Sequence, residues 1–189
     1  MKLVGASRVC KKGFWVYLGM GSSLGDRKKS LLQALTRLDG RNELSLMEVS
    51  PIYESPHMGL EPGDETKFPS HLNLVAKFET TLSPEKLLEI IHEVEAEGKR
   101  DRTLKWGPRT IDIDILDYEG VERLTERLVL PHPCLALRLF VVQPLLDLDP
   151  NYRMRNGKKL TILLGKPPLD LQKAFKLSND SELIAHPKL

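Results

Sequence analysis

The chain has 189 residues, 41% of them hydrophobic and 29% charged, which is the balance of an ordinary globular domain with one core. Its formal net charge of +2 is too small to indicate a nucleic-acid-binding protein, and no apolar run is long enough to predict a membrane span. Two cysteines, Cys10 and Cys134, exclude a disulfide framework or a zinc site and favour a reducing compartment.

The N-terminal segment, residues 1–13, is basic and carries no acidic residue. Two interpretations are open, a transit peptide or a short extension ahead of the first strand. The extension is favoured because the segment is short and a β-prone run follows at once.

The first strand is predicted at residues 14–18, a β-prone run, and the first helix from leucines at i, i+4 and i+7 (Leu31, Leu35, Leu38). Between them lies the glycine-rich segment 19–26. Its spacing fits neither a P-loop nor the dinucleotide fingerprint, so it is interpreted as a tight turn beside a site.

A second strand is predicted to start at Leu46 and to run toward Tyr53, followed by a segment rich in proline and glycine up to about Ser70. A connection this long inside a compact domain is usually functional or disordered. A third strand is predicted over residues 72–80. Ser83-Pro84 then begins a helix that ends near Gly98, because a cap residue precedes a proline at the first helical position.

Residues 111–115 read Ile-Asp-Ile-Asp-Ile, an alternation that predicts a strand with one buried face. Asp112 and Asp114 then share the other face, about 7 Å apart. Like charges this close repel unless a cation or a polar partner lies between them. Carboxylates without His or Cys neighbours favour a hard cation, and Mg²⁺ with a phosphate substrate fits best. An acidic face exposed to water is the alternative.

The loop before this strand, residues 99–109, carries arginines and lysines around Trp106. Arginine forks bind phosphate in a bidentate manner, and an exposed tryptophan suits a flat partner such as a purine or pteridine ring. A solvated loop and a nucleic-acid contact are the alternatives, but the chain lacks a broad basic face.

The remaining chain has weaker signals. His132 lies between two prolines and is either a structural histidine or a phosphate contact. Residues 139–142 predict a further strand or the start of a buried helix, and 160–164 predict one helical turn. The order strand, helix, strand, strand, helix, strand indicates an α+β fold with a ferredoxin-like βαββαβ core, an antiparallel sheet flanked by helices.

Residues 106–115, Trp-Gly-Pro-Arg-Thr-Ile-Asp-Ile-Asp-Ile, resemble the signature of the 6-hydroxymethyl-7,8-dihydropterin pyrophosphokinase family of folate synthesis. The resemblance covers residues 14–164, which we expect to form the family's domain. Residues 1–13 would be an extension and 165–189 a weakly structured tail, with no room for a fused neighbour domain.

The resemblance implies transfer of pyrophosphate from ATP, the co-substrate, to the hydroxymethyl group of the pterin, with release of AMP. It implies two Mg²⁺ ions on Asp112 and Asp114, small-molecule partners without nucleic acid or membrane, and a cytoplasmic monomer. The implied catalytic residues are Arg100, Arg109, Asp112 and Asp114. The implied ATP contacts are His92, Glu95, Arg102, Trp106, Arg109, Ile115, Arg127, Val129, His132 and Arg138. The implied pterin contacts are Ser55, Pro56, Met58, His71, Asn73, Trp106 and Phe140, with Arg138 and Phe140 matching the family's last site strand.

Three positions depart from the family pattern: Ser23 replaces Asn, His71 replaces an aromatic residue and Lys105 replaces Arg. An imidazole stacks more weakly than a larger ring. Ser23 and His71 motivate one rival function, a family member that binds pterin as a regulator. A ferredoxin-like nucleotide- or RNA-binding module without chemistry is the other rival.

Overall fold

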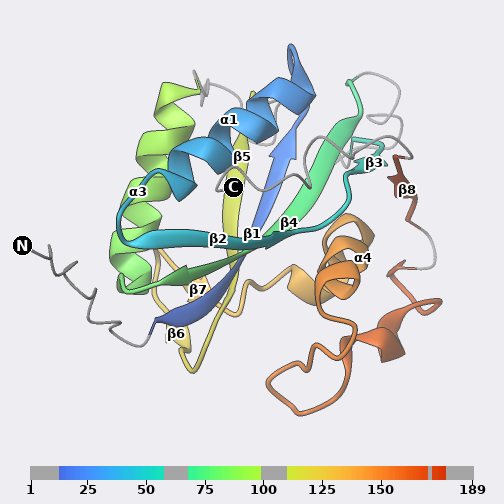
Figure 1. Cartoon of the computed structure of the whole chain (residues 1–189). Coiled ribbons are helices and arrows are strands. Elements are labelled where there is room, and N and C mark those ends of the chain that lie inside the picture. Colours follow the sequence, from blue (N-terminus) through green and yellow to red (C-terminus); the bar gives the residue numbers. More distant parts are fainter. Residues whose placement is uncertain (1–12, 58–67, 99–109, 170–171, 178–189) are drawn as a thin grey trace, which may run out of the picture.

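The computed structural model describes residues 13–57, 68–98, 110–169 and 172–177. The strands are β1 (Phe14–Ser22), β2 (Leu44–Val49), β3 (Tyr53–Ser55), β4 (His71–Thr80), β5 (Asp112–Tyr118), β6 (Arg123–Leu124), β7 (Val129–Leu130) and β8 (Phe175–Lys176). The helices are α1 (Arg27–Asp39), α3 (Pro84–Glu97) and α4 (Leu139–Leu148), with 3₁₀ turns η1 (Leu135–Leu137) and η2 (Leu160–Leu163) (Figure 1). The helical turn predicted at 160–164 is therefore confirmed.

The main sheet has the order β5-β1-β4-β3-β8, with β2 also paired to β4 and all these neighbours antiparallel. Because β2 and β3 share one side of β4, the sheet matches the predicted ferredoxin-like core, which is confirmed. The single second strand predicted from Leu46 toward Tyr53 is wrong. Pro51 has no N–H for the ladder, and the hydroxyl of Ser50 accepts from the backbone N–H of Val75 at 2.9 Å where the ladder breaks.

Both helices predicted before residue 100 are confirmed, and each begins at a side-chain cap. Asp26 accepts from the backbone N–H of Lys29 at 3.0 Å at the start of α1. Ser83 accepts from the backbone N–H of Lys86 at 3.3 Å, and Pro84 is the first residue of α3. These caps satisfy backbone donors that a helix start leaves without intrahelical partners.

The sheet buries both of its faces. Val16, Leu18 and Met20 of β1 belong to the core beneath α1 and α3, whereas Tyr17 belongs to the core beneath α4. This alternation follows from the period of two in a strand. Figure 1 shows α1 and α3 together on one side of the sheet and α4 on the other. A side chain's parity on a strand therefore decides whether it faces the two-helix side or the α4 side.

Residues 139–148 form helix α4, so the helical interpretation of 139–142 is confirmed and the strand suggested by the family resemblance for Arg138 and Phe140 is wrong. The backbone N–H of Val142 donates to the carbonyl of Arg138 at 2.9 Å, which closes the first helical turn. A short apolar run does not distinguish a strand from a buried helix by periodicity.

Among the described residues after Gly165, 175–177 contact the sheet edge. Phe175 and Lys176 pair with β3, the backbone N–H of Leu177 donates to the carbonyl of Ile52 at 2.9 Å, and Leu169 is buried. The domain boundaries at residues 13 and 164 remain predictions.

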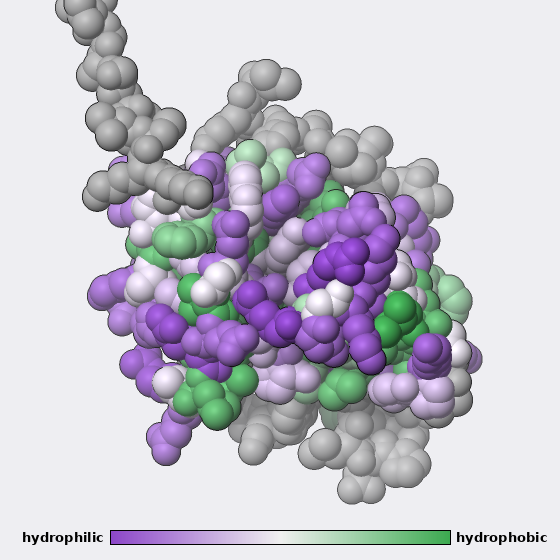
Figure 2. Space-filling view, turned by 90° about the horizontal axis from the view of Figure 1, so that it is seen from below, coloured by the Kyte–Doolittle hydropathy of each residue, from purple (hydrophilic) through white to green (hydrophobic). Residues whose placement is uncertain are grey.

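The surface seen in Figure 2 is mainly hydrophilic, with apolar side chains in separate small patches. In the part of the chain that the structure describes, every helix is too short or too polar to cross a membrane.

Replacement of Tyr152 by phenylalanine is expected to lower the free energy of unfolding by about 1.5–3 kcal/mol, the usual value of a hydrogen bond to a charged group. The Tyr152 hydroxyl donates to Oδ2 of Asp117 at 2.6 Å, while Arg155 donates to Oδ1 at 2.6 Å. Burial, and then the bond to Asp117, raises the pKa of Tyr152, so the hydroxyl keeps its proton. Thermal unfolding checks this, since Tm should fall by about 2–4 °C per kcal/mol. An unchanged Tm would contradict it.

Candidate functional site

The two aspartates of β5 stand on the α4 side of the sheet. Ile113 and Ile115 are buried in the core beneath α1 and α3, with exposed fractions of 4% and 3%, and Asp112 and Asp114 are half-buried. The alternation predicted from the sequence is therefore confirmed for this strand. Both carboxylates are presented on one face, as a shared cation would require.

Glycines of β1 lie directly beside these aspartates. Gly21 pairs with Asp112 on one side and with Asn73 of β4 on the other. A Cβ atom placed on Gly21 would lie 3.3 Å from Oδ1 of Asn73. Asp112 and Asn73 are two strand spacings apart, about 10 Å between their Cα atoms, and Gly21 places no side chain of its own between this acidic site and this amide site. We call Gly21 and the surface above it the glycine lane.

The amide side of the lane is built by β3 and β4. Nδ2 of Asn73 donates to Oγ of Ser55 at 3.0 Å, and both side chains are buried. His71 pairs with Ser55 in the ladder, and its Nε2 lies 2.9 Å from Nδ1 of His57. The His57 ring also stands 4.6 Å from the ring of Phe68. The structure thus brings together the predicted pterin residues Ser55, His71 and Asn73.

His132 is held beside the acidic side of the lane. Its backbone N–H donates to the carbonyl of Leu116 in β5 at 2.8 Å, and its Nδ1 accepts from the backbone N–H of Cys134 at 3.1 Å. Burial lowers the pKa of His132, and Arg138 acts in the same direction, while Asp114 and, less strongly, Asp112 oppose them. The neutral ring carries its proton on Nε2, because Nδ1 is an acceptor.

Glu95 supports β5 from the other face of the sheet. The residue is 1% exposed, and its Oε1 accepts from the backbone N–H of Ile113 at 2.9 Å. That N–H lies between the two aspartates in sequence, so the contact fixes the stretch of strand that carries them. The sequence predicted an ATP contact for Glu95, which stays a prediction, and gave no sign of this support.

The other predicted residues are placed as follows. Arg127 is exposed after β6, Val129 is half-buried in β7, His92 is half-buried on α3, Ile115 lies in the core, Pro56 is half-buried after β3 and Phe140 is half-buried on α4. Cζ of Arg138 lies 5.8 Å from the centre of the Phe140 ring. Arg100, Arg102, Trp106, Arg109 and Met58 lie outside the described residues, as does the basic extension.

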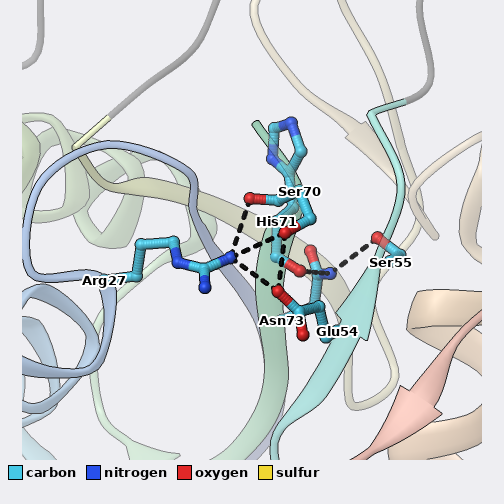
Figure 3. A network of polar contacts seen from close by, with 6 residues as sticks. All are labelled: Arg27, Glu54, Ser55, Ser70, His71 and Asn73. Carbon is cyan, nitrogen blue, oxygen red and sulfur yellow. Dashed lines mark hydrogen bonds and ion pairs between the residues drawn. The ribbon is translucent and has the colours of Figure 1, made fainter. Parts of the chain in front are cut away.

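Sequence reasoning missed a polar network at the first residue of α1. Nη1 of Arg27 donates to Oε1 of Glu54 at 2.9 Å and to the carbonyl and hydroxyl oxygens of Ser70 at 3.0 and 2.9 Å (Figure 3). The Ser70 hydroxyl in turn donates to the same Glu54 oxygen at 2.6 Å. The partners are 27 and 43 residues from Arg27, so no local pattern could reveal them.

The donor set of the acidic side fits Mg²⁺. Within residues 13–57, 68–98, 110–169 and 172–177, no group of three or more His, Cys, Asp or Glu side chains forms a ready metal cage. Mg²⁺ is commonly held by one or two carboxylates, with phosphate and water completing its octahedron. Asp112 and Asp114 supply that pair.

A family model described as 7,8-dihydro-6-hydroxymethylpterin-pyrophosphokinase matches residues 17–150. The 2-amino-4-hydroxy-6-hydroxymethyldihydropteridine pyrophosphokinase of Aquifex aeolicus is 44% identical over 136 residues, which are 72% of this chain and 81% of that protein. The enzyme of the same name from Pseudomonas aeruginosa is 38% identical over 155 residues, covering 82% of this chain and 93% of that protein.

Some relatives are much longer than this chain. The bifunctional protein FolKE of Lactococcus lactis is 44% identical over 133 residues, 70% of this chain but only 36% of that protein. The crystal structure of Plasmodium falciparum HPPK-DHPS wild type with pteroate gives a TM-score of 0.60 at 14% identity, covering 80% of this chain and 42% of that one. The structural likeness supports the fold, and the sequence matches show that the chain belongs to the 7,8-dihydro-6-hydroxymethylpterin-pyrophosphokinase family.

Proposed function

We propose that this chain is a Mg²⁺-dependent pyrophosphokinase of folate synthesis, which transfers pyrophosphate from ATP to the hydroxymethyl group of 6-hydroxymethyl-7,8-dihydropterin and releases AMP. Family membership supports the reaction. The observation that carries the assignment to this site is the glycine lane, with Asp112 and Asp114 on one side and Asn73 and Ser55 on the other. Because the acidic and the amide sides are about 10 Å apart across β1, phosphates bound at one side would stand beside a pterin bound at the other.

On the acidic side, Asp112 and Asp114 would hold two Mg²⁺ ions. Bound Mg²⁺ supplies charge neutralisation to the phosphates of ATP. His132 would donate a hydrogen bond from Nε2 to a phosphate oxygen, and Arg138 would add a cation. Phosphoryl-type transfer asks a protein chiefly for positioning and charge, so no nucleophilic side chain is needed.

On the amide side, Asn73 and Ser55 would bind the polar edge of the pterin. Their mutual hydrogen bond fixes the direction of the amide before substrate arrives. His71 and Phe140 would contact the ring. Arg100, Arg102, Trp106 and Arg109 would close over both substrates and exclude water, a role that rests on the sequence alone. A cytoplasmic monomer is part of the proposal, and it rests on the cysteine content and on the family.

Product analysis tests the function. The purified chain, incubated with ATP, Mg²⁺ and hydroxymethyl-dihydropterin, should form AMP and the pterin diphosphate in equal amounts. Omission of pterin, or excess EDTA, should abolish AMP. Formation of ADP, or no turnover, would refute the proposal. Pterin binding without turnover would favour the regulator, and RNA binding with a steep salt dependence and no need for the two aspartates would favour the RNA module.

A further inference from the structure

Arg27 makes hydrogen bonds to two segments that are far apart in the sequence, β3 and the residue before β4. It is the first residue of α1, and one of its guanidinium nitrogens contacts Glu54 of β3 and Ser70, the residue before β4 (Figure 3). The side chains of Arg27 and Glu54 are 30% and 35% exposed. The bond from Ser70, and then the one from Arg27, lowers the pKa of the Glu54 carboxyl, so the pair is ionised at neutral pH.

These contacts lie on the face of the sheet opposite the glycine lane. Glu54 pairs with Leu72, whose side chain is buried in the core beneath α1 and α3. The next residue in β3, Ser55, pairs with His71. Because neighbouring residues of a strand point to opposite faces, Ser55 and His71 point to the lane side. Arg27 therefore contacts the β3–β4 ladder on the α1 and α3 face of the sheet. The same ladder carries the predicted pterin residues on the opposite face.

The ladder needs such support because β3 is short. It has three residues and pairs with β4 only through Tyr53, Glu54 and Ser55. Its last residue, Ser55, accepts the hydrogen bond from Asn73 at 3.0 Å. A small rotation of β3 would move this oxygen away from the Asn73 amide. The Arg27 contacts to Glu54 and Ser70 fix both strands at the step where the bond is made.

We propose that Arg27 is a positioning residue for pterin recognition, which holds β3 and β4 in the register that aligns Ser55, His71 and Asn73. The inference rests on the proposed function, since those three residues must contact the pterin. Arg27 would act from the opposite face of the sheet, through Glu54 and Ser70. Loss of Arg27 should therefore weaken binding of the pterin and leave binding of ATP unchanged.

The test is steady-state kinetics with each substrate varied in turn. Arg27→Ala should raise the KM for the pterin about tenfold, the equivalent of one well-placed hydrogen bond, and should change kcat and the KM for ATP less than about twofold. Arg27→Lys keeps the positive charge but lacks the planar guanidinium group, so its KM for the pterin should lie between those of the wild type and Arg27→Ala. Since exposed ion pairs add little to stability, Tm should fall by no more than about 2–4 °C.

Arg41→Ala is the matched control. Nη2 of Arg41 lies 3.1 Å from Oε2 of Glu93, an ion pair just beyond the other end of α1 with side chains 36% and 58% exposed. The Arg41→Ala variant removes a comparable ion pair from the residue after the C-cap of α1, and its KM for the pterin should stay at the wild-type value. Equal effects of both variants would overturn the inference, because a general loosening of α1 would then explain them.

Asn73→Ala separates this inference from the proposed function. A raised pterin KM in Asn73→Ala together with a wild-type pterin KM in Arg27→Ala would overturn the positioning role and leave the function standing. A wild-type pterin KM in Asn73→Ala would overturn the positioning role and the placement of the pterin beside Asn73, while the measured turnover would leave the proposed reaction standing. Should Arg27→Ala fail to fold, Arg27→Lys and Glu54→Gln decide, and a wild-type pterin KM in both overturns the role.

Discussion

Replacement of Asp114 by asparagine is expected to lower kcat for AMP formation about 10³-fold, which corresponds to about 4 kcal/mol of lost transition-state stabilisation. The substitution keeps the shape of the side chain and removes one of two charges that share a face of β5. An amide is a weaker ligand for a hard cation than a carboxylate is. Asp112→Asn should behave alike, since both aspartates stand beside β1 glycines. AMP release measured across a Mg²⁺ titration checks the loss.

Asp117→Asn is the matched control on the same strand. Asp117 accepts hydrogen bonds from Tyr152 and Arg155, each at 2.6 Å, so its charge stabilises the folded chain. This variant should lose about 1.5–3 kcal/mol per weakened bond and keep its kcat at temperatures where it is folded. Asp114→Asn should show the reverse, with Tm unchanged or slightly raised because repulsion from Asp112 is relieved. A wild-type kcat and Mg²⁺ dependence in both Asp112→Asn and Asp114→Asn would contradict the assignment of the metal site.

The features that the sequence predicted well are those that depend on residues close together in the sequence. The Ser83 side-chain cap and the proline ring of Pro84 determine where α3 starts. The alternation at 111–115 determines which side chains of β5 are buried. Both depend on steric and hydrogen-bonding rules that act over a few residues. The predicted order of elements then sufficed for the fold, because few topologies satisfy short, right-handed connections.

The features that the sequence did not reveal depend on which strands lie side by side. Nothing near Gly21 indicates that Asp112 and Asn73 flank it, 91 and 52 positions further along the chain. The network of Arg27, Glu54 and Ser70 is hidden for the same reason. The apolar run after Arg138 is short and continuous, so its sequence is compatible with either a helix or a strand. The packing of α4 against the sheet determines that it is a helix.

Gly21→Val is expected to lower kcat/KM for the pterin about 10²-fold, since a displacement of about 1 Å in a reacting group can cost that much. Valine suits a strand, so β1 should still pair with β4 and β5. Its branched side chain would fill the glycine lane and push the Asn73 amide aside, because even a Cβ atom lies 3.3 Å from Oδ1. Gly21→Ala should give a smaller loss. Kinetics with the pterin varied, alongside thermal unfolding, measure both.

A double-mutant cycle shows whether the loss passes through Asn73. If Gly21→Ala acts by displacing that amide, it should cost little more in a chain that already carries Asn73→Ala, since the displaced group is gone. Additive losses in kcat/KM would mean that the methyl group acts elsewhere, and the lane would then not couple the two sides of the site. A wild-type kcat/KM in Gly21→Val would refute the lane outright. Strong coupling would instead show that the methyl group acts through the Asn73 amide, as the 3.3 Å approach requires.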